Sequence, residues 1–378
     1  MKGKCPKFVP MFSFTDVPEH VRQEWKNDFV AAINDGFFIG GGSVQQFEKE
    51  WANFIGSSFS CGVGNGFDAL VLALKALDIK KGDRVLVPAH TFIATWFAID
   101  YVGAIPVGID VDEAGLMDIK RCPVKASTIS AILPVHMHGR KVDIESLVEF
   151  MKGARNRHFK IIEDSSQYHK RMQFVTSLTG RRHLVVHSLY PTKNLGALGD
   201  AGIVSMNSIE IERFVKTYRN YGASATNKYL HRGFGVNTRL DSLQARFLST
   251  NLRHLEEGDD HRRKIAKIYY NILEGSECRF LHSYDSDSTY HHFVIRVRGR
   301  DQLKRYLQTQ GIQTDIHYPN LAAHEYSKLR GVKQIRYPRA EQLAKEMLSL
   351  PISPWMKFED AVYVAEVIRR GVTSRQFL

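Results

Sequence analysis

The chain carries, near its centre, the segment Lys160-Ile161-Ile162-Glu163-Asp164-Ser165-Ser166-Gln167, a short apolar run that ends in polar residues. A run of this length is typical of a buried strand and is short for a helix. In open sheets of parallel strands, ligands bind outside the carboxyl ends of the strands. The polar residues Asp164 and Gln167 are therefore candidates for a binding site.

The same alternation extends on both sides of this segment, from about residue 60 to residue 206. Further apolar runs of strand length lie at 60–63, 84–88, 105–109, 129–135, 184–188 and 203–206. Helical patterns lie between some of them, at 68–77, 91–102 and 144–152. Buried strands that alternate with helices predict an α/β protein with a doubly wound, mostly parallel sheet.

The N-terminal residues that precede this region are expected to be helical. Residues 18–35 have the apolar spacing of an amphipathic helix, which Gly36 ends. A glycine-rich hinge follows at 37–42. Ser43 and Gln46 then have the spacing of a capping box, which predicts that a second helix begins at Ser43.

The C-terminal residues indicate a second, smaller unit. A long helix is expected over 240–273, and after it the patterns predict a strand at 290–297, a helix at 300–310 and a strand at 312–318. We place a domain boundary in the long helix. The expected division is a large domain over 1–250 and a small α+β domain over 251–378.

The composition argues against a membrane protein, a secreted protein and a nucleic-acid-binding protein. No run approaches the ~20 apolar residues of a membrane helix, and no secretory signal is recognisable. The 4 cysteines are scattered without CxxC spacing, so we expect no metal site and a cytoplasmic protein with reduced thiols. The net charge of +12 suits an anionic partner, but no nucleic-acid-binding motif accompanies it. Most of this charge is expected to be ordinary solvated surface, and a smaller part is expected to serve an anionic substrate such as a phosphorylated small molecule.

A lysine follows another of the predicted strands, in the segment Ser188-Leu189-Tyr190-Pro191-Thr192-Lys193-Asn194-Leu195-Gly196. A lysine amine can condense with an aldehyde cofactor after it loses its proton, which requires a pKa below the usual value of about 10.4. Position alone leaves open that Lys193 is an ordinary solvent-facing residue of a loop.

Asp164 occupies the corresponding place after its own strand. A carboxylate buried at that depth needs a cationic or hydrogen-bonding partner, and a protonated pyridinium nitrogen would supply one. The ion pair would keep the nitrogen protonated, so that the ring could accept electrons. The alternative, of equal weight from the sequence alone, is that Asp164 caps a following helix.

Two segments nearer the N-terminus suit other parts of a cofactor. Residues 62–68 form a glycine-rich turn that opens a helix, where free amides and the helix dipole favour a phosphate. Phe92 follows the strand at 84–88 and could stack on a flat ring. The alternatives are a tight turn without a ligand and an aromatic side chain that belongs to the core.

Together and in this order, these segments resemble the DegT/DnrJ/EryC1/StrS family of sugar aminotransferases. The resemblance runs from the hinge at 37–42 to residues 348–355. Its most specific parts are the motifs at 163–167 and 188–200, and the motifs at 219–222 and 237–245 also match well. The resemblance implies an aspartate-aminotransferase-like fold (PLP fold type I), with a mixed, mostly parallel sheet in a large domain and a small C-terminal α+β domain. The implied cofactor is pyridoxal 5'-phosphate (PLP).

The resemblance also implies a role for each residue at the cofactor ring. Lys193 is similar to the lysine that forms the Schiff base and moves the proton between substrate and cofactor. Asp164 is similar to the partner of the pyridine nitrogen. Gln167 matches the residue that donates a hydrogen bond to the ring oxygen, and Phe92 matches the stacking residue.

Further implied roles concern the cofactor phosphate. The backbone amides of Gly66 and Phe67 and the hydroxyl of Ser188 match the family's phosphate site. Asn237 is similar to a residue that reaches this phosphate from the neighbouring subunit. The implied active unit is therefore a homodimer in which each site needs both chains.

The implied reaction is transamination of a nucleotide-linked keto-sugar, with L-glutamate as amino donor, in deoxyamino-sugar or surface-polysaccharide biosynthesis. Residues 64–70 and 90–96 resemble the subgroup that aminates carbon 3 of dTDP-3-keto-6-deoxyhexoses. Tyr190, His317 and Tyr318 are the candidates for substrate contacts. The alternatives are an aminotransferase acting at carbon 4 and a PLP-binding sensor without turnover.

Overall fold

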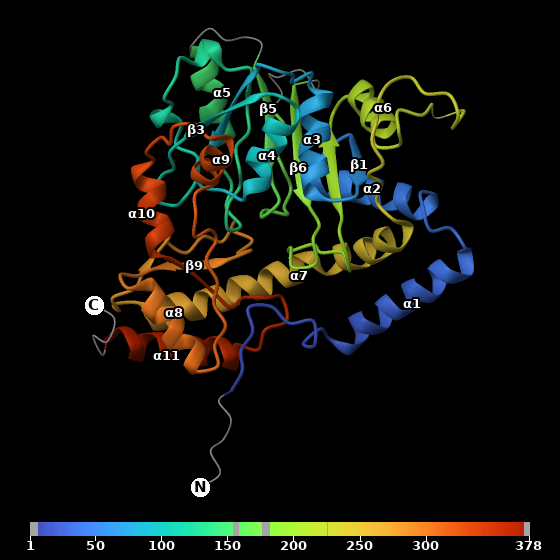
Figure 1. The fold of residues 1–378 in the computed structure, drawn as a ribbon. Helices are drawn as coiled ribbons and strands as arrows, with labels where there is room; N and C mark the ends of the chain where they lie inside the picture. Colours follow the sequence, from blue (N-terminus) through green and yellow to red (C-terminus); the bar gives the residue numbers. More distant parts are fainter. Residues whose placement is uncertain (1–6, 154–158, 176–181, 225, 374–378) are drawn as a thin grey trace.

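A central sheet organises the first two thirds of the chain in the computed structural model, which describes residues 7–153, 159–175, 182–224 and 226–373 (Figure 1). Within these residues the sheet has seven strands in the order β1-β7-β6-β5-β4-β2-β3. The strands are β1 (Phe59–Val63), β2 (Arg84–Pro88), β3 (Ile105–Ile109), β4 (Ala131–Ile132), β5 (Lys160–Asp164), β6 (His183–Ser188) and β7 (Gly202–Met206). Only β7 runs antiparallel to its neighbours, β6 and β1. The predicted mostly parallel sheet is confirmed.

The strand β4 is shorter than the apolar run at 129–135 predicts. Leu133 still donates its amide to the carbonyl of Leu86, at 2.8 Å. The next residue, Pro134, has no amide proton and cannot continue the ladder. Its carbonyl accepts from the amide of Asp164 at 2.9 Å, so this segment remains tied to the end of β5.

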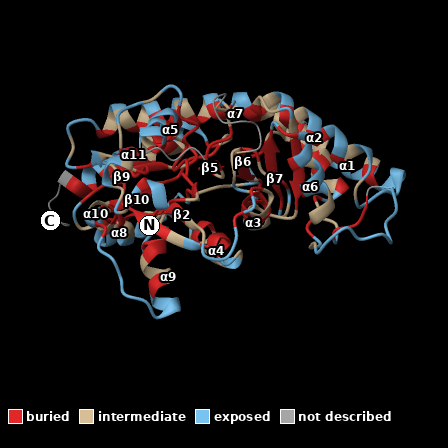
Figure 2. Cartoon of the chain, turned by 90° about the horizontal axis from the view of Figure 1, so that it is seen from above, coloured by how far each residue is buried: buried red, intermediate tan, exposed pale blue. Residues whose placement is uncertain are grey.

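Helices cover the sheet, and Figure 2 shows buried strands between helices whose outward faces are exposed. They are α3 (Gly66–Ala76), α4 (Ile93–Tyr101), α5 (Ile144–Gly153) and α6 (Ile209–Tyr218), with the 3₁₀ turns η1 (Ile119–Arg121) and η2 (Ala126–Thr128) between α4 and α5. Because α3 begins directly after β1 and α4 soon after β2, both helix N-termini lie at the carboxyl edge of the sheet.

Two N-terminal helices precede the sheet, α1 (Glu19–Asp35) and α2 (Gly42–Ile55). The predicted capping box at Ser43 is wrong, because α2 begins one residue earlier and its N-cap, Gly41, makes no side-chain hydrogen bond. Gly41 has φ 85° and ψ −168°, which only glycine adopts readily. The hinge therefore turns into the helix before Ser43 can act as a cap.

The last third begins with the long helix α7 (Ser242–Leu273) and contains a second sheet with the order β10-β9-β8. Its elements are β8 (Arg279–Phe280), β9 (Phe293–Arg296), α8 (Arg300–Thr309), α9 (Ala322–Arg330), α10 (Pro338–Glu346), β10 (Met347–Leu350) and α11 (Phe358–Thr373). The predicted strand at 312–318 is wrong. This segment makes only single bridges, Ile312 to Val9 and Asp315 to Ser349 of β10, and forms no continuous ladder.

The helix α7 runs along both parts of the molecule without a break (Figure 1). Its first half packs Leu248 and Leu255 into an apolar cluster with Trp51 of α2. Its second half packs Ile265 and Tyr269 into the core of the C-terminal unit. The domain boundary near residue 250 stays a prediction. Among the described residues, no helix is both long and apolar enough to cross a membrane.

Candidate active site

One cavity of 430 Å³ opens at the carboxyl ends of β2, β5 and β6. The residues that line it come from both the sheet and the C-terminal unit. Those predicted from the sequence are Gly66, Phe67, Phe92, Asp164, Gln167, Ser188, Tyr190, Lys193, His317 and Tyr318. The structure thus brings together every predicted site residue except Asn237.

Lys193 lies in the connection between β6 and β7, where its amide donates to the carbonyl of Tyr190 at 2.8 Å. The connection is closed by a hydrogen bond of 2.9 Å from the Leu189 amide to the Ala201 carbonyl. Burial lowers the pKa of the Lys193 amine to about 8, and the nearby Asp164 carboxylate opposes this shift. At neutral pH the amine therefore loses its proton far more readily than an exposed lysine does.

The Asp164 carboxylate is 4% exposed and is fixed through both of its oxygens. Thr95 donates its hydroxyl to Oδ2 at 2.9 Å, and the Ser166 amide donates to Oδ1 at 3.1 Å. No helix follows within residues 165–175, so the alternative role of Asp164 as a helix cap is wrong. The short turn to Ser166 instead holds the carboxylate at the wall of the cavity.

The side chain of Gln167 is oriented by a hydrogen bond from the backbone of His138. Its Oε1 accepts from the His138 amide at 2.8 Å, which leaves the Nε2 hydrogens free to donate. Nε2 is 3.1 Å from the hydroxyl of Tyr318. Gln167 therefore presents a donor to the cavity, as a residue that binds a ring oxygen must.

Phe92 shares the cavity wall with Tyr318, and the centroids of their rings are 5.5 Å apart. Phe92 is 54% exposed, so it is not a core residue and the core alternative is wrong. An exposed aromatic face beside a cavity is a surface on which a flat ring can stack.

The N-terminus of α3 presents unpaired amides to the same cavity. Asn65 caps this helix by accepting from the Asp68 amide at 2.9 Å. The amides of Gly66 and Phe67 have no hydrogen-bond acceptor in the ranges that the structure describes. A Cβ atom on Gly66 would lie 2.7 Å from Cβ of Ser188, so glycine is needed for the close approach of Ser188. Free amides, a helix N-terminus and a hydroxyl together fit a phosphate.

The structure adds site residues that the sequence did not reveal. Thr95 binds Asp164, and its place one turn into α4 gives no recognisable signal. Asn65 could have been found, because the spacing from Asn65 to Asp68 is that of a helix cap. His291 and His292 line the cavity from the C-terminal unit. Only the tertiary fold brings these two histidines to Lys193.

Asn237 does not line the cavity of its own chain. It is exposed and makes a single bridge to Asn220. Its expected contact with the phosphate of a neighbouring subunit stays a prediction.

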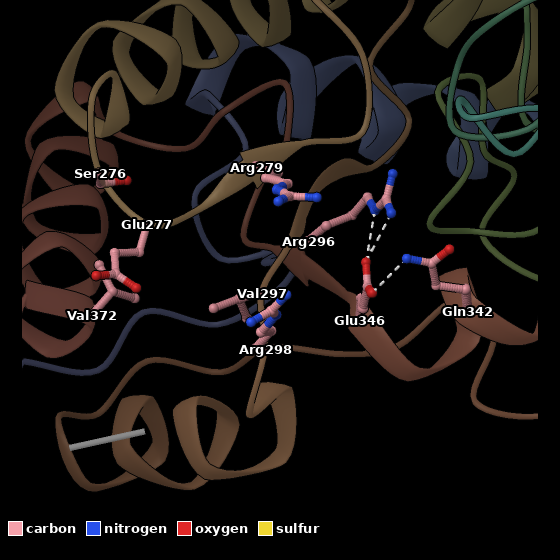
Figure 3. Close-up of a pocket in the computed structure, with 9 residues that line it drawn as sticks. All are labelled: Ser276, Glu277, Arg279, Arg296, Val297, Arg298, Gln342, Glu346 and Val372. Atoms are coloured by element: carbon pink, nitrogen blue, oxygen red, sulfur yellow. Dashed lines mark hydrogen bonds and ion pairs between the residues drawn. The ribbon is translucent and has the colours of Figure 1, made fainter. Parts of the chain in front are cut away.

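A second cavity of 410 Å³ lies in the C-terminal unit and is lined mostly by polar and charged side chains (Figure 3). Arg296 is bound there by the Glu346 carboxylate, at 3.1 Å from Nε and 2.8 Å from Nη2. The other lining residues are Ser276, Glu277, Arg279, Val297, Arg298, Gln342 and Val372. This cavity is separate from the predicted site and shares no lining residue with it.

The sequence matches known proteins over most of its length. It is 36% identical over 351 residues to the erythromycin biosynthesis sensory transduction protein EryC1 of Saccharopolyspora erythraea, covering 90% of this chain and 93% of that protein. It is 35% identical to the dTDP-3-amino-3,6-dideoxy-alpha-D-galactopyranose transaminase of Aneurinibacillus thermoaerophilus, covering 96% and 99% of the two chains.

The fold also has solved counterparts. The crystal structure of DesV of S. venezuelae in complex with a ketimine intermediate superposes with a TM-score of 0.89 at 31% identity, and covers 97% of this chain and 99% of that one. The aspartate-aminotransferase-like fold is thereby confirmed. The model of the DegT/DnrJ/EryC1/StrS aminotransferase family matches residues 19–369. The chain therefore belongs to this family of PLP-dependent aminotransferases, as the order of its motifs predicted.

Proposed function

We propose that this enzyme transfers the amino group of L-glutamate to carbon 3 of a nucleotide-linked keto-sugar, a dTDP-3-keto-6-deoxyhexose, with PLP as cofactor. The observation that carries the proposal is the Lys193 amine, with its pKa lowered to about 8, in the cavity that Asp164 also lines. The relative from A. thermoaerophilus, named as a dTDP-3-amino-sugar transaminase, supports the choice of substrate.

Bound PLP would supply an aldehyde carbon and an electron-withdrawing ring. The unprotonated Lys193 amine would be the group that holds PLP through that carbon, and it could also accept and return a proton during the reaction. Asp164, fixed by Thr95 and Ser166, can keep a ring nitrogen protonated. Gln167 Nε2, which donates to the Tyr318 hydroxyl, has a second hydrogen that could be donated to the ring oxygen, and the ring could stack on the exposed face of Phe92.

The phosphate would be held at the start of α3. The amides of Gly66 and Phe67 donate without competition from the protein, and the Ser188 hydroxyl lies against Gly66. The helix dipole adds a favourable field at the same point. These residues would hold the phosphate of the cofactor in the cavity that Lys193 also lines.

We also propose a homodimer in which Asn237 completes the phosphate site of its partner. The segment just before Asn237 exposes large apolar side chains, with Tyr229 80% and Phe234 98% exposed. Apolar side chains this exposed, on a segment that carries a predicted site residue, are typical of an interface between subunits. The scattered cysteines, which the sequence suggests are reduced thiols, support our proposal that the enzyme is cytoplasmic.

Two other functions remain as alternatives. A carbon-4 aminotransferase would use the same cofactor residues and differ only in how the sugar lies. A sensor without turnover is favoured by the name of the relative from S. erythraea. The Lys193 amine and the Asp164 carboxylate, which line the same cavity, favour catalysis over sensing alone.

The test is to convert the purified enzyme to its pyridoxamine form with L-glutamate and to measure the 2-oxoglutarate released. The pyridoxamine form is then mixed with dTDP- and UDP-linked 3-keto and 4-keto sugars, and return of the aldehyde spectrum is recorded. We expect the dTDP-3-keto-6-deoxyhexose to restore it fastest. Lys193→Ala should do neither reaction. A wild-type enzyme that binds PLP but releases no 2-oxoglutarate would instead be a sensor.

A further inference from the structure

His291 enters the cavity from the C-terminal unit and faces it beside Lys193, although no role has been given to it so far. The residue is 6% exposed and lies just before β9. Its ring nitrogen Nδ1 is 3.0 Å from Oδ1 of Asn194, the residue that follows Lys193. The histidine is thus joined to the loop that carries the reactive amine.

The orientation of the Asn194 amide follows from its other neighbours. Its Nδ2 lies 2.6 Å from Oδ1 of Asp259, on α7, and 2.8 Å from the backbone carbonyl of Thr289. A backbone carbonyl can only accept a hydrogen bond, so the atom that faces it must be the NH₂ group. The atom that faces His291 is therefore the carbonyl oxygen Oδ1.

This orientation decides which nitrogen of His291 carries the proton. Because Oδ1 of Asn194 can only accept, Nδ1 of His291 must donate to it. In a neutral imidazole the other nitrogen, Nε2, is then an acceptor. Nε2 has no partner among the residues whose positions are described, and it is not enclosed by protein.

The ring is neutral at physiological pH. Burial lowers the pKa of His291 well below its usual value, and the positive charges of Lys193 and Arg262 lower it further. Asp259 does not reverse this, because it contacts Asn194 and not the ring. The cavity therefore contains one fixed, uncharged acceptor beside the reacting amine.

We propose that His291, held by Asn194 and Asp259, accepts a hydrogen bond through Nε2 from a hydroxyl of the sugar next to the carbon that receives the amine. The inference rests on the proposed function, since it names a contact of the same substrate. A sugar hydroxyl is a donor and matches Nε2. The carboxylates of glutamate can only accept, so His291 offers them no hydrogen bond.

The proposal predicts that a change at His291 affects the half-reaction with the sugar and not the half-reaction with glutamate. His291→Leu should leave the glutamate half-reaction within about threefold of the wild-type rate. The sugar half-reaction should slow by roughly 10-fold to 100-fold, because a hydrogen bond to a buried group is lost. His291→Gln should restore most of the rate, since its side-chain amide can place an acceptor near the position of Nε2.

The sugar half-reaction is measured in reverse, with dTDP-3-amino-3,6-dideoxygalactose as the probe and the change in cofactor absorbance as the readout. The same probe without its 2-hydroxyl, and without its 4-hydroxyl, identifies the group that His291 contacts. We expect one of these deoxy sugars to react equally fast with wild type and His291→Leu. An exposed histidine of α1 provides the matched control, His20→Leu, which should change neither half-reaction.

Three results would overturn the inference. One is an equal loss in both half-reactions of His291→Leu, which would mean that the residue acts on Lys193 or on folding. Another is the same penalty for all three sugars. The third is a wild-type enzyme that reacts with glutamate but with no dTDP-amino sugar, which refutes the proposed substrate itself and can be recognised without any variant.

Discussion

A single methyl group added at Gly66 should weaken binding of the cofactor through its phosphate. In Gly66→Ala the new Cβ would lie 2.7 Å from Cβ and 3.1 Å from Cα of Ser188, well inside the ordinary contact distance. The start of α3 and the end of β6 must move apart to relieve this contact. Overpacking of this kind costs about 1–3 kcal/mol, and the free amides then no longer meet the Ser188 hydroxyl around one phosphate.

Converted at a factor of ten per ~1.4 kcal/mol, the expected loss of PLP affinity is roughly 5-fold to 150-fold. The assay titrates cofactor-free protein with PLP, and in parallel with pyridoxal, which lacks the phosphate. Affinity for pyridoxal should change much less than affinity for PLP. The control is Gly153→Ala, since a Cβ at Gly153 meets nothing within 4 Å. If Gly66→Ala keeps the wild-type preference for PLP over pyridoxal, this placement of the phosphate is refuted.

Three further results follow from the same cavity. Asp164→Asn removes a buried charge, so kcat should fall by roughly 10²-fold to 10⁴-fold while the cofactor stays bound. Stopped-flow spectra of the glutamate half-reaction would measure this loss. A loss below threefold would contradict the role of Asp164 as partner of the ring nitrogen. Because only the unprotonated amine reacts, the pKa of Lys193 predicts that the rate of PLP uptake by cofactor-free protein rises with pH and becomes constant above about pH 8. A rate that still rises at pH 10 would indicate an exposed lysine. Mixing Lys193→Ala chains with Asn237→Ala chains should recover activity, because each hybrid dimer has one intact site; activity no higher than in either parent would exclude a shared site.

Much of the fold is readable from local sequence because buried strands in this sheet are continuous apolar runs. β2 and β3 lie at the predicted residues, and β5 ends at Asp164, so the run that precedes Asp164 places it correctly. The length of β4 and the start of α2 were predicted wrongly because, in each case, a single residue changes the backbone that its neighbours favour. Pro134 interrupts the ladder of β4, and Gly41 starts α2 before the expected cap.

Only part of the candidate site could be predicted from the sequence. Residues at the ends of sheet strands could be predicted, because the topology alone brings those ends together. His291 and Asp259 could not, because their place depends on how the C-terminal unit and α7 pack against the loop of Lys193. The segment 312–318 was misread for a related reason, since its neighbours, Val9 and Ser349, are distant in sequence.

The antiparallel direction of β7 fixes the loop of Lys193 to the large sheet. Because β7 returns beside β6, the loop that carries Lys193 is fastened at both ends to one rigid sheet. His291, His292 and His317 approach the same space from the C-terminal unit. Lys193 and Tyr190 therefore lie on a loop of the large sheet, whereas these three histidines lie on the C-terminal unit. We expect that exchange of the segments after α7 would alter the contacts of His291 and His317 with the sugar while Lys193 and Asp164 stay in place.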